Sequence, residues 1–583
     1  MNRLDKTDFI LLISFATLII FPLLYLFRAL DDNTLTSWRW VFSGLRIELV
    51  FGMILGGLAI ALSLSTLTLS ERQYPAVLLL LSFCAVIPLW GVPEALIDTS
   101  RYFLQAKQVN VHGIGYFFRE WGSGIGAWTD LPLVPFFYGM IFKYLGESRI
   151  YIQLFTTLLF SFTILFTYRI GATLWNDETG FTGGLLLLGI PYLMTQVPLM
   201  LVDVPAMFLL TLATFTFLVA VEKGGVHRIL LAAFVIFLAV LSKYSLWLML
   251  LVLPVIPFSA GWSCGKTAFF RSAAILTIAG VLSGAVLLAA YDTVRDQLHL
   301  LRTYQWSGLQ RWQESFVSTF FFQSHPFITI LALFGMVTAV RKGDGKFLIP
   351  GWFAAFIFIL HVERIRYILP LFPFFTLMAS YGLQQVQKLQ VRRFIAYSTV
   401  ATALVVAIGV YLPFLNTTSM ANLRNAGKYL DTLNGEAVEV RTVPQIASTG
   451  NTEMAIPLLD LYTKKQLTYR RKRPLPPGID VVNRSSLRFT WEVELPEFYR
   501  QAPEKAGPHR PLAIIASRPV TVPPRGMMPD DSVRPGVRQF TLQAEPFRYR
   551  TTVSVFERNG LAVTAHAFSG NCPIRDSGPL LTR

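Results

Sequence analysis

Long apolar runs separated by short polar breaks fill the first 415 residues of the chain. Most runs are roughly 20 residues long, the length that an α-helix needs to cross the hydrocarbon core of a bilayer. The runs lie at 9–30, 44–69, 74–92, 149–174, 179–197, 203–221, 228–242, 244–260, 270–291, 326–340, 348–361, 367–385 and 394–415. This pattern predicts an all-α polytopic membrane bundle of about thirteen transmembrane helices.

The composition favours a membrane protein over a soluble one. Hydrophobic residues make up 53% of the chain, charged residues only 15%, and the mean hydropathy is +0.50. Soluble domains carry about 25% charged residues. The net charge of +16 is divided evenly between the first 416 residues and the rest. Because no basic stripe stands out, we expect no nucleic-acid partner.

Charges in the short loops predict the orientation of the spans. If the N-terminus lies inside, every inside loop is basic, as the positive-inside rule requires. These loops lie near Arg72 and at 223–228, 266–271, 341–346 and 388–393. The same topology places two long loops, 91–149 and 291–325, on the outer side. Within the first of them, 102–106 and 136–145 read as amphipathic helices in the interface.

The composition changes after Asn416, where the remaining residues hold 17 of the 33 prolines. Stretches at 437–443 and 549–556 alternate apolar and polar residues and predict strands, whereas 470–478 reads as a loop. We therefore expect a soluble α/β or β-rich domain over 416–583, outside the membrane. The transmembrane part divides into two additional N-terminal helices, 1–73, and a main module, 74–415.

Ionisable residues gather at the predicted outer ends of five segments. They are Asp98, Asp130, Asp203, Lys243 and the group in 361–367. Each has a local alternative: Asp98 and Asp203 could cap helices, Asp130 could form a turn, and Lys243 and Arg366 could reach lipid head groups. Ionisable groups at membrane depth are costly and usually functional. Their location on one face favours a shared site.

The local sequences of these segments, in this order, resemble the GT-C superfamily of polytopic glycosyltransferases, especially its protein O-mannosyltransferase-like and aminoarabinose-transferase-like branches. The matching segments are Asp98-Thr-Ser-Arg-Tyr102, Thr129-Asp-Leu-Pro-Leu133 with Phe142-Lys-Tyr-Leu-Gly146, Val202-Asp-Val-Pro205, Leu241-Ser-Lys-Tyr244 and Glu363-Arg-Ile-Arg-Tyr-Ile-Leu-Pro370. The resemblance covers roughly 74–385. The chain departs from the family pattern at Thr99, where the first motif has a second acidic residue.

The resemblance implies a GT-C-like catalytic module over 74–415. It implies inverting transfer of a sugar from a polyprenyl-phosphate-linked donor to a glycan, lipid or protein acceptor on the outer face, with a carboxylate as general base. We assign catalysis to Asp98 and Asp203. We assign the donor phosphate to Lys243, Arg364, Arg366 and Tyr367, and the acceptor or cavity wall to Arg101, Tyr102, Asp130 and Glu363. We expect location in a bacterial inner membrane.

Three other functions remain open at the level of sequence. A transporter or flippase of lipid-linked sugars would also bury charges, although near the bilayer midplane and commonly between repeated halves. A non-catalytic glycan-assembly subunit could use the C-terminal domain as a binding module. A ligase or polymerase could move whole lipid-linked glycans. The sequence assigns no cofactor with certainty, and Thr99 argues against the divalent metal that the resemblance leaves open.

Overall fold

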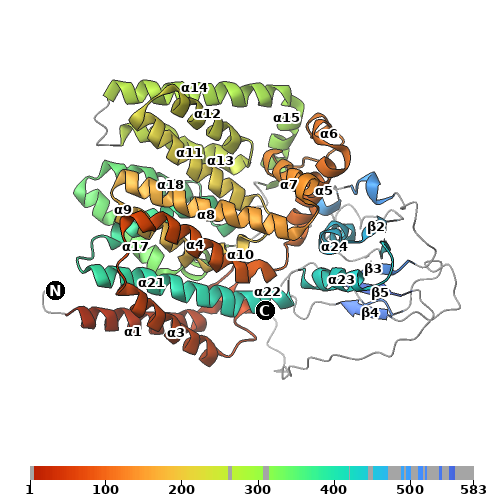
Figure 1. Cartoon of the computed structure of the whole chain (residues 1–583), viewed down its shortest axis with the longest axis horizontal. Coiled ribbons are helices and arrows are strands. Elements are labelled where there is room, and N and C mark those ends of the chain that lie inside the picture. Colours follow the sequence, from red (N-terminus) through yellow and green to blue (C-terminus); the bar gives the residue numbers. More distant parts are fainter. Residues whose placement is uncertain are drawn as a thin grey trace.

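The computed structural model contains a helical bundle that carries a small sheet domain at one end (Figure 1). The residues that the structure describes are 5–259, 265–305, 314–418, 420–443, 451–469, 488–491, 494–500, 510–516, 519–521, 537–540 and 551–557. The loop expected at 470–478 lies outside them. The expected fold class, an all-α membrane bundle with a C-terminal α/β or β-rich region, is confirmed.

Seven segments in the described part of the chain are long and apolar enough to cross a membrane. They are α1 (Lys6–Leu26), α3 (Ile47–Ser65), Glu71–Gly91 with α4 (Tyr74–Val86) at its centre, α8 (Arg149–Leu174), α11 (Asp203–Lys223), α14 (Gly265–Ala289), and Leu389–Thr417 with α21 (Leu389–Val406) and α22 (Leu412–Thr417). The chain is therefore a membrane protein, and the total of thirteen spans stays a prediction.

Shorter helices complete the bundle and its loops. They are α2 (Trp38–Val41), α5 (Leu96–His112), α6 (Ile114–Glu120), α7 (Leu133–Leu145), α9 (Asp177–Leu186), α10 (Pro191–Gln196), α12 (Val226–Val240), α13 (Tyr244–Met249), α15 (Tyr291–Leu300), α17 (Pro326–Lys342), α18 (Leu348–Ile359), α19 (Ile365–Ile368) and α20 (Phe372–Leu383). The helices expected at 102–106 and 136–145 are thus confirmed as parts of α5 and α7.

Proline breaks two of the expected spans. The apolar run 179–197 divides into α9, a 3-10 turn and α10, because Pro191 begins α10 and the preceding Ile190 is extended. The run 244–260 continues after α13 as a 3-10 helix, Leu250–Phe258, that contains Pro254 and Pro257. Proline removes a backbone donor and clashes with a regular α-helix, which explains both departures from a single straight span.

Close helix packing in the bundle depends on small residues. A Cβ atom on Gly382 of α20 would lie 2.2 Å from the Leu331 carbonyl oxygen of α17, and one on Gly335 would lie 2.3 Å from the Met378 carbonyl oxygen. The two backbones therefore touch where their glycines face each other. Small residues at such crossings are typical of membrane helices, whose association relies on tight packing.

The C-terminal region forms a five-stranded mixed sheet in the order β2-β1-β3-β5-β4. Its strands are β1 (Ala437–Thr442), β2 (Gln466–Tyr469), β3 (Leu512–Ala516), β4 (Val537–Phe540) and β5 (Thr552–Phe556). Strands β1–β3 are parallel, whereas β5 is antiparallel to β3 and β4. Helices α23 (Ala421–Thr432) and α24 (Ile456–Tyr462) pack between the sheet and the bundle. The strand expected at 437–443 is confirmed as β1, and the strand expected at 549–556 is confirmed over Thr552–Phe556, whereas positions 549 and 550 lie outside the described residues.

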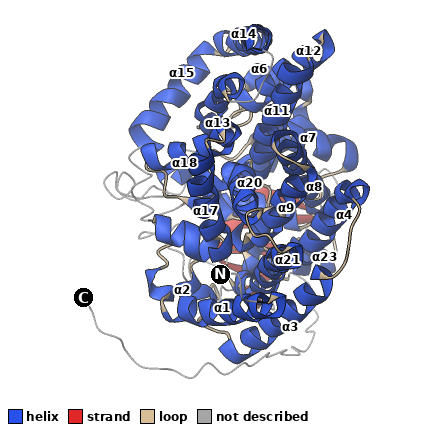
Figure 2. Cartoon of the chain, turned by 90° about the vertical axis from the view of Figure 1, so that its left-hand side faces the viewer, coloured by secondary structure: helices blue, strands red, loops and turns tan. Residues whose placement is uncertain are grey.

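The sheet domain lies at the same end of the bundle as α5, α6, α7 and α15 (Figure 1). Viewed from the opposite end, the strands appear behind the packed helices (Figure 2). Helix α24 lies against α5. Helix α5 is thus held between the bundle and the C-terminal domain, and it carries the first acidic residue of the predicted site.

Candidate active site

Helix α5 supplies the acidic end of the site. Asp98 lies in its first turn and Arg101 one turn later, where Arg101 Nη2 approaches Asp98 Oδ1 at 3.4 Å. Arg101 also forms a two-bond pair with Asp130 through Nε and Nη2, the latter 2.9 Å from Asp130 Oδ1. Gln105 Nε2 donates to the Asp130 carboxylate at 3.2 Å and to the Gly126 carbonyl at 3.0 Å. Asp130 is therefore fixed by side chains on two successive turns of α5.

A second carboxylate faces this group from the bundle. Asp203 is the first residue of α11, and its side chain is 1% exposed. Lys243, which precedes α13, places Nζ 2.5 Å from Asp203 Oδ1. Arg366, in the short helix α19, donates from Nε to Asp203 Oδ2 at 2.8 Å. Three segments far apart in sequence therefore meet at one buried carboxylate.

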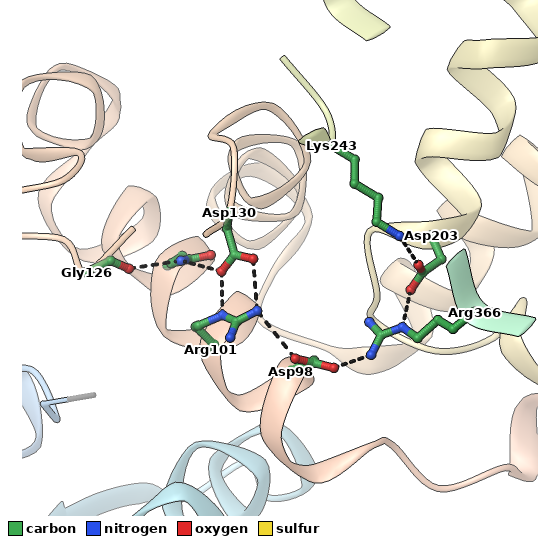
Figure 3. A network of polar contacts seen from close by, with 8 residues as sticks. Asp98, Arg101, Gly126, Asp130, Asp203, Lys243 and Arg366 are labelled. Carbon is green, nitrogen blue, oxygen red and sulfur yellow. Dashed lines mark hydrogen bonds and ion pairs between the residues drawn. The ribbon is translucent and has the colours of Figure 1, made fainter. Parts of the chain in front are cut away.

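Arg366 joins the two acidic groups into one network, as Figure 3 shows. Its Nη1 donates to Asp98 Oδ2 while its Nε donates to Asp203. The network consists of three carboxylates and three cations: Asp98, Asp130, Asp203, Arg101, Lys243 and Arg366. Its formal charges balance. Asp98 is the most open of the carboxylates, with 26% of its side chain exposed.

The arginines control the protonation of Asp98. Burial alone would raise the pKa of this carboxyl, but the Arg366 and Arg101 guanidiniums outweigh burial and hold the pKa well below its usual range. The pKa of Arg366 is in turn raised well above its ordinary value, because the neighbouring carboxylates outweigh its burial. Asp98 is therefore ionised in this arrangement, yet it is a weak base while Arg366 is bound to it.

Of the remaining predicted residues, Tyr102, Tyr367 and Arg364 take part in contacts between a cation and an aromatic ring. The Arg101 guanidinium lies 5.3 Å from the ring centre of the buried Tyr102. The ring centre of Tyr367 lies near two cations, 5.5 Å from Lys243 Nζ and 5.4 Å from the Arg364 guanidinium. These distances allow cation–π attraction. The structure thus places Arg364 next to the network.

Glu363 contacts residues outside the network of Asp98, Asp130 and Asp203. Its carboxylate lies 3.2 Å from His361 Nε2, in a pair that is largely exposed, and its carbonyl oxygen accepts from Thr319 Oγ1 at 2.7 Å. The side chain of Glu363 therefore contacts its own loop. Its assignment to the acceptor or cavity wall stays a prediction.

Of the local alternatives for the charged residues, the turn at Asp130 is present, whereas the others do not hold. Helix α5 begins after Ala95 and α11 after Val202, so neither Asp98 nor Asp203 is a helix cap. The Asp130 backbone N–H does form a turn with the Ala127 carbonyl, but its carboxylate pairs with Arg101. Lys243 and Arg366 likewise direct their charges to Asp203 and not to lipid head groups.

A buried acidic residue that the sequence analysis missed supports the start of α5. Glu94 is fully buried and pairs with Arg149 Nε at 2.7 Å. Its Oε2 also accepts from Met200 N at 2.9 Å and from Thr99 Oγ1 at 3.2 Å. The position of Glu94 at the end of the third apolar run was a signal that could have identified it. The hydroxyl of Thr99, the residue that departs from the family motif, thus donates a hydrogen bond to Glu94.

The described residues do not present a ligand set for a metal ion. Within the part of the chain that the structure describes, no group of three His, Cys, Asp or Glu side chains is placed to hold one. Asp98 and Asp130 both face Arg101, whose charge opposes a nearby cation. The residues present therefore do not fit a metal site, and we derive no step through a metal.

The chain is similar to a known protein family in sequence and to solved structures in fold. The sequence model of the dolichyl-phosphate-mannose-protein mannosyltransferase family matches residues 130–289. The crystal structure of ArnT from Cupriavidus metallidurans bound to undecaprenyl phosphate is 13% identical, with a TM-score of 0.50, and the match covers 83% of this chain and 97% of that one. Its apo state matches over the same shares at 12% identity and a TM-score of 0.50. No curated protein sequence matches.

A third structure is the archaeal oligosaccharyltransferase AglB from Archaeoglobus fulgidus, in complex with an inhibitory peptide and a dolichol-phosphate. It is 12% identical, with a TM-score of 0.46 over 77% of this chain and 70% of that chain. The family whose model matches residues 130–289 consists of glycosyltransferases of the GT-C type. The resemblance to the GT-C superfamily that the motifs indicated is thus confirmed, and the fold is ArnT-like.

Proposed function

We propose that this protein is a membrane glycosyltransferase that moves a sugar from a polyprenyl-phosphate-linked donor to an acceptor hydroxyl or phosphate on the outer face of a bacterial inner membrane. The observation that carries the proposal is the position of Arg366, which bridges Asp98 and Asp203 beside Lys243. A carboxylate and a set of cations thus lie together, as this reaction requires. The undecaprenyl phosphate bound by ArnT supports the class of donor.

The transfer needs a base and a cationic site for the leaving group. For a hydroxyl acceptor, Asp98 takes the proton as the acceptor oxygen attacks the anomeric carbon. The bond from that carbon to the phosphate oxygen breaks, and its electron pair leaves with the polyprenyl phosphate. Attack opposite the leaving group inverts the anomeric centre. Arg366, Arg364 and Lys243 stabilise the charge that develops on the phosphate.

The resting network implies competition between the donor and the carboxylates. Every cation of the network in Figure 3 has a carboxylate partner before substrate arrives. A donor phosphate that binds Arg366 would therefore weaken its bond to Asp98. Because that bond lowers the pKa of Asp98, donor binding would strengthen the base at the moment when it is needed. Arg366 would thus couple donor binding to activation of the acceptor.

Two substitutions in reconstituted vesicles test the proposal. The assay measures transfer of labelled sugar from a synthetic polyprenyl-phosphate sugar to acceptors from the cell envelope. We expect Asp98→Asn to lower kcat by about 100-fold or more, since general base catalysis contributes 10²–10⁴-fold. We expect Arg366→Ala to raise the donor KM. Transfer at the wild-type rate in Asp98→Asn would refute the role of the base.

A matched control and a topology measurement complete the test. Asp292→Asn is the control, because Asp292 lies on α15 at the same end of the bundle and its side chain is 83% exposed. It should transfer sugar at the wild-type rate. Cysteines placed at 98 and 292, where the native side chains are 26% and 83% exposed, should react with an impermeant reagent from the outer side only. Movement of intact donor across the membrane without release of polyprenyl phosphate would indicate a flippase instead.

A further inference from the structure

The segment 314–323 holds the basic turn that contains Arg364 and Arg366. Glu314 Oε2 accepts a hydrogen bond from the backbone N–H of Ile365 at 3.1 Å. Thr319 Oγ1 donates to the carbonyl oxygen of Glu363 at 2.7 Å. The two bonds lie on either side of Arg364 and fix the backbone directly before Arg366. The position of both guanidiniums therefore depends on this segment.

The same segment is held on its other side by the connection between α1 and α3. Asp31, which is 1% exposed, accepts from Ser318 Oγ at 2.6 Å through Oδ1 and from Gln323 Nε2 at 2.9 Å through Oδ2. Its Oδ2 also accepts from Trp38 N at 2.6 Å, and Oδ1 accepts from Asn33 N at 3.2 Å. Four donors thus converge on one carboxylate, which has about four acceptor sites.

Two further contacts fix the ends of the segment. Asp32 Oδ1 accepts from both the backbone N–H and the hydroxyl of Ser315, at 3.0 and 3.1 Å. Gln323 Oε1 accepts from the buried Tyr411 hydroxyl at 2.9 Å. The segment is therefore attached to the N-terminal part of the chain near Ser315 and to the hydroxyl of Tyr411 at Gln323. Between these points it contacts the basic turn.

We propose that Asp31 is a positioning residue for the donor phosphate, acting through Ser318 and Gln323 on the segment 314–323 and so on Arg364 and Arg366. The role of the donor phosphate in this inference rests on the proposed function. The support that Asp31 gives to Arg364 and Arg366 does not. This support gives the residues before the main module a role in the reaction. A shift of about 1 Å in a binding group can lower a rate 100-fold. A residue that does not touch the substrate can therefore affect the reaction by fixing the positions of Arg364 and Arg366.

The test compares Asp31→Asn with a matched substitution elsewhere. Asparagine keeps the shape of Asp31 but replaces one carboxylate oxygen with an NH₂ group. The donors that bind this oxygen therefore lose their acceptor. The control is Asp344→Asn, because Asp344, like Asp31, accepts from a side-chain N–H (the Trp175 indole, 3.0 Å) and from a backbone N–H (Lys346, 3.1 Å). It follows α17, roughly 25 Å along the bundle at 1.5 Å per residue.

In the transfer assay we expect Asp31→Asn to raise the donor KM about tenfold, the effect of losing one hydrogen bond to a charged group. The acceptor KM should change less than about twofold, whereas kcat should also fall, because the same two arginines stabilise the leaving phosphate. Hydrogen exchange measured by mass spectrometry should accelerate in residues 363–367 relative to Asp344→Asn. Adding Gln323→Glu to Asp31→Asn lets the new amide donate to a carboxylate and should recover part of the donor KM.

Two results would overturn the inference. One is exchange in 363–367 that is the same in Asp31→Asn as in the wild type. The other is a change in donor KM no larger than that of Asp344→Asn. If the wild-type protein transfers no sugar at all, the proposed function fails, and the exchange measurement alone still decides whether Asp31 supports the basic turn.

Discussion

Replacing Arg366 should move the pH dependence of the reaction by a predictable amount. Arg366 donates to Asp98 and to Asp203, and Asp98 keeps only a longer contact with Arg101, at 3.4 Å, when Arg366 is removed. A cation beside a carboxylate favours the ionised form, so loss of that cation raises the pKa. An opposite charge within about 4–6 Å shifts a pKa by about 1–3 units. Arg366→Gln should therefore raise the pKa of Asp98 by about 1–3 units.

The assay is the pH profile of kcat/KM, which reports the ionisation of the free enzyme. Activity falls at low pH as the base is protonated, so the acid limb of Arg366→Gln should lie about 1–3 units above that of the wild type. Arg366→Lys keeps a charge but lacks the planar fork that reaches two carboxylates, so its shift should be smaller. Arg119→Gln, at an exposed pair with Glu120, is the control and should not move the limb.

The reasoning would be refuted by an acid limb in Arg366→Gln that coincides with the wild-type limb. In that case there are two explanations. Either protonation of Asp98 is not what inactivates the enzyme at low pH, or Arg366 does not lower the pKa of Asp98. Asp98→Asn separates the two explanations. If Asp98 is the base, this variant loses the limb together with most of its activity. If Asp98→Asn keeps the acid limb and its activity, protonation of another group causes the loss of activity at low pH.

Two predictions concern stability in detergent. Glu94→Gln should cost about 3 kcal/mol, because it leaves the buried Arg149 guanidinium without its carboxylate, and a melting temperature equal to the wild type would contradict this pairing. Burial raises the pKa of Glu314 from 4.5 to about 7, so its stabilising effect is complete below pH 4.5 and is lost as the pH rises through 7. Melting temperatures should fall from pH 5 to 8, and Glu314→Gln should remove up to about 3 kcal/mol of that dependence.

The sequence predicts much of the bundle because a membrane span leaves a direct signal in length and hydropathy. The apolar runs at 9–30 and 203–221 correspond to α1 and α11 within a few residues. The runs that proline interrupts are less predictable. In 179–197 the composition suits a span, but Pro191 forces Ile190 out of the helical region. Hydropathy alone does not register such a break.

The residues of the candidate site could be proposed from the sequence, but their partners could not. Asp98, Asp203 and Arg366 each stand in a recognisable motif at the end of a segment. The bond from Arg366 to Asp98 joins positions 268 apart, and no local pattern specifies it. The supporting residues left weaker signals still. Asp31 and Glu314 occupy loops of ordinary composition, and only the packing of the N-terminal part against 314–323 reveals what they contact.

The resting pairs also explain why Asp98 and Asp203, the two carboxylates that Arg366 contacts, should differ in role. An arginine that awaits a phosphate in a buried site needs a partner, because an unpaired buried charge costs several kcal/mol. Asp98 and Asp203 both provide one. If a phosphate takes Arg366, Asp203 keeps Lys243 at 2.5 Å, whereas Asp98 keeps only Arg101, which is already bound to Asp130 through two bonds. Asp98 is also the more exposed carboxylate, so it is the one whose basicity rises where an acceptor can reach it.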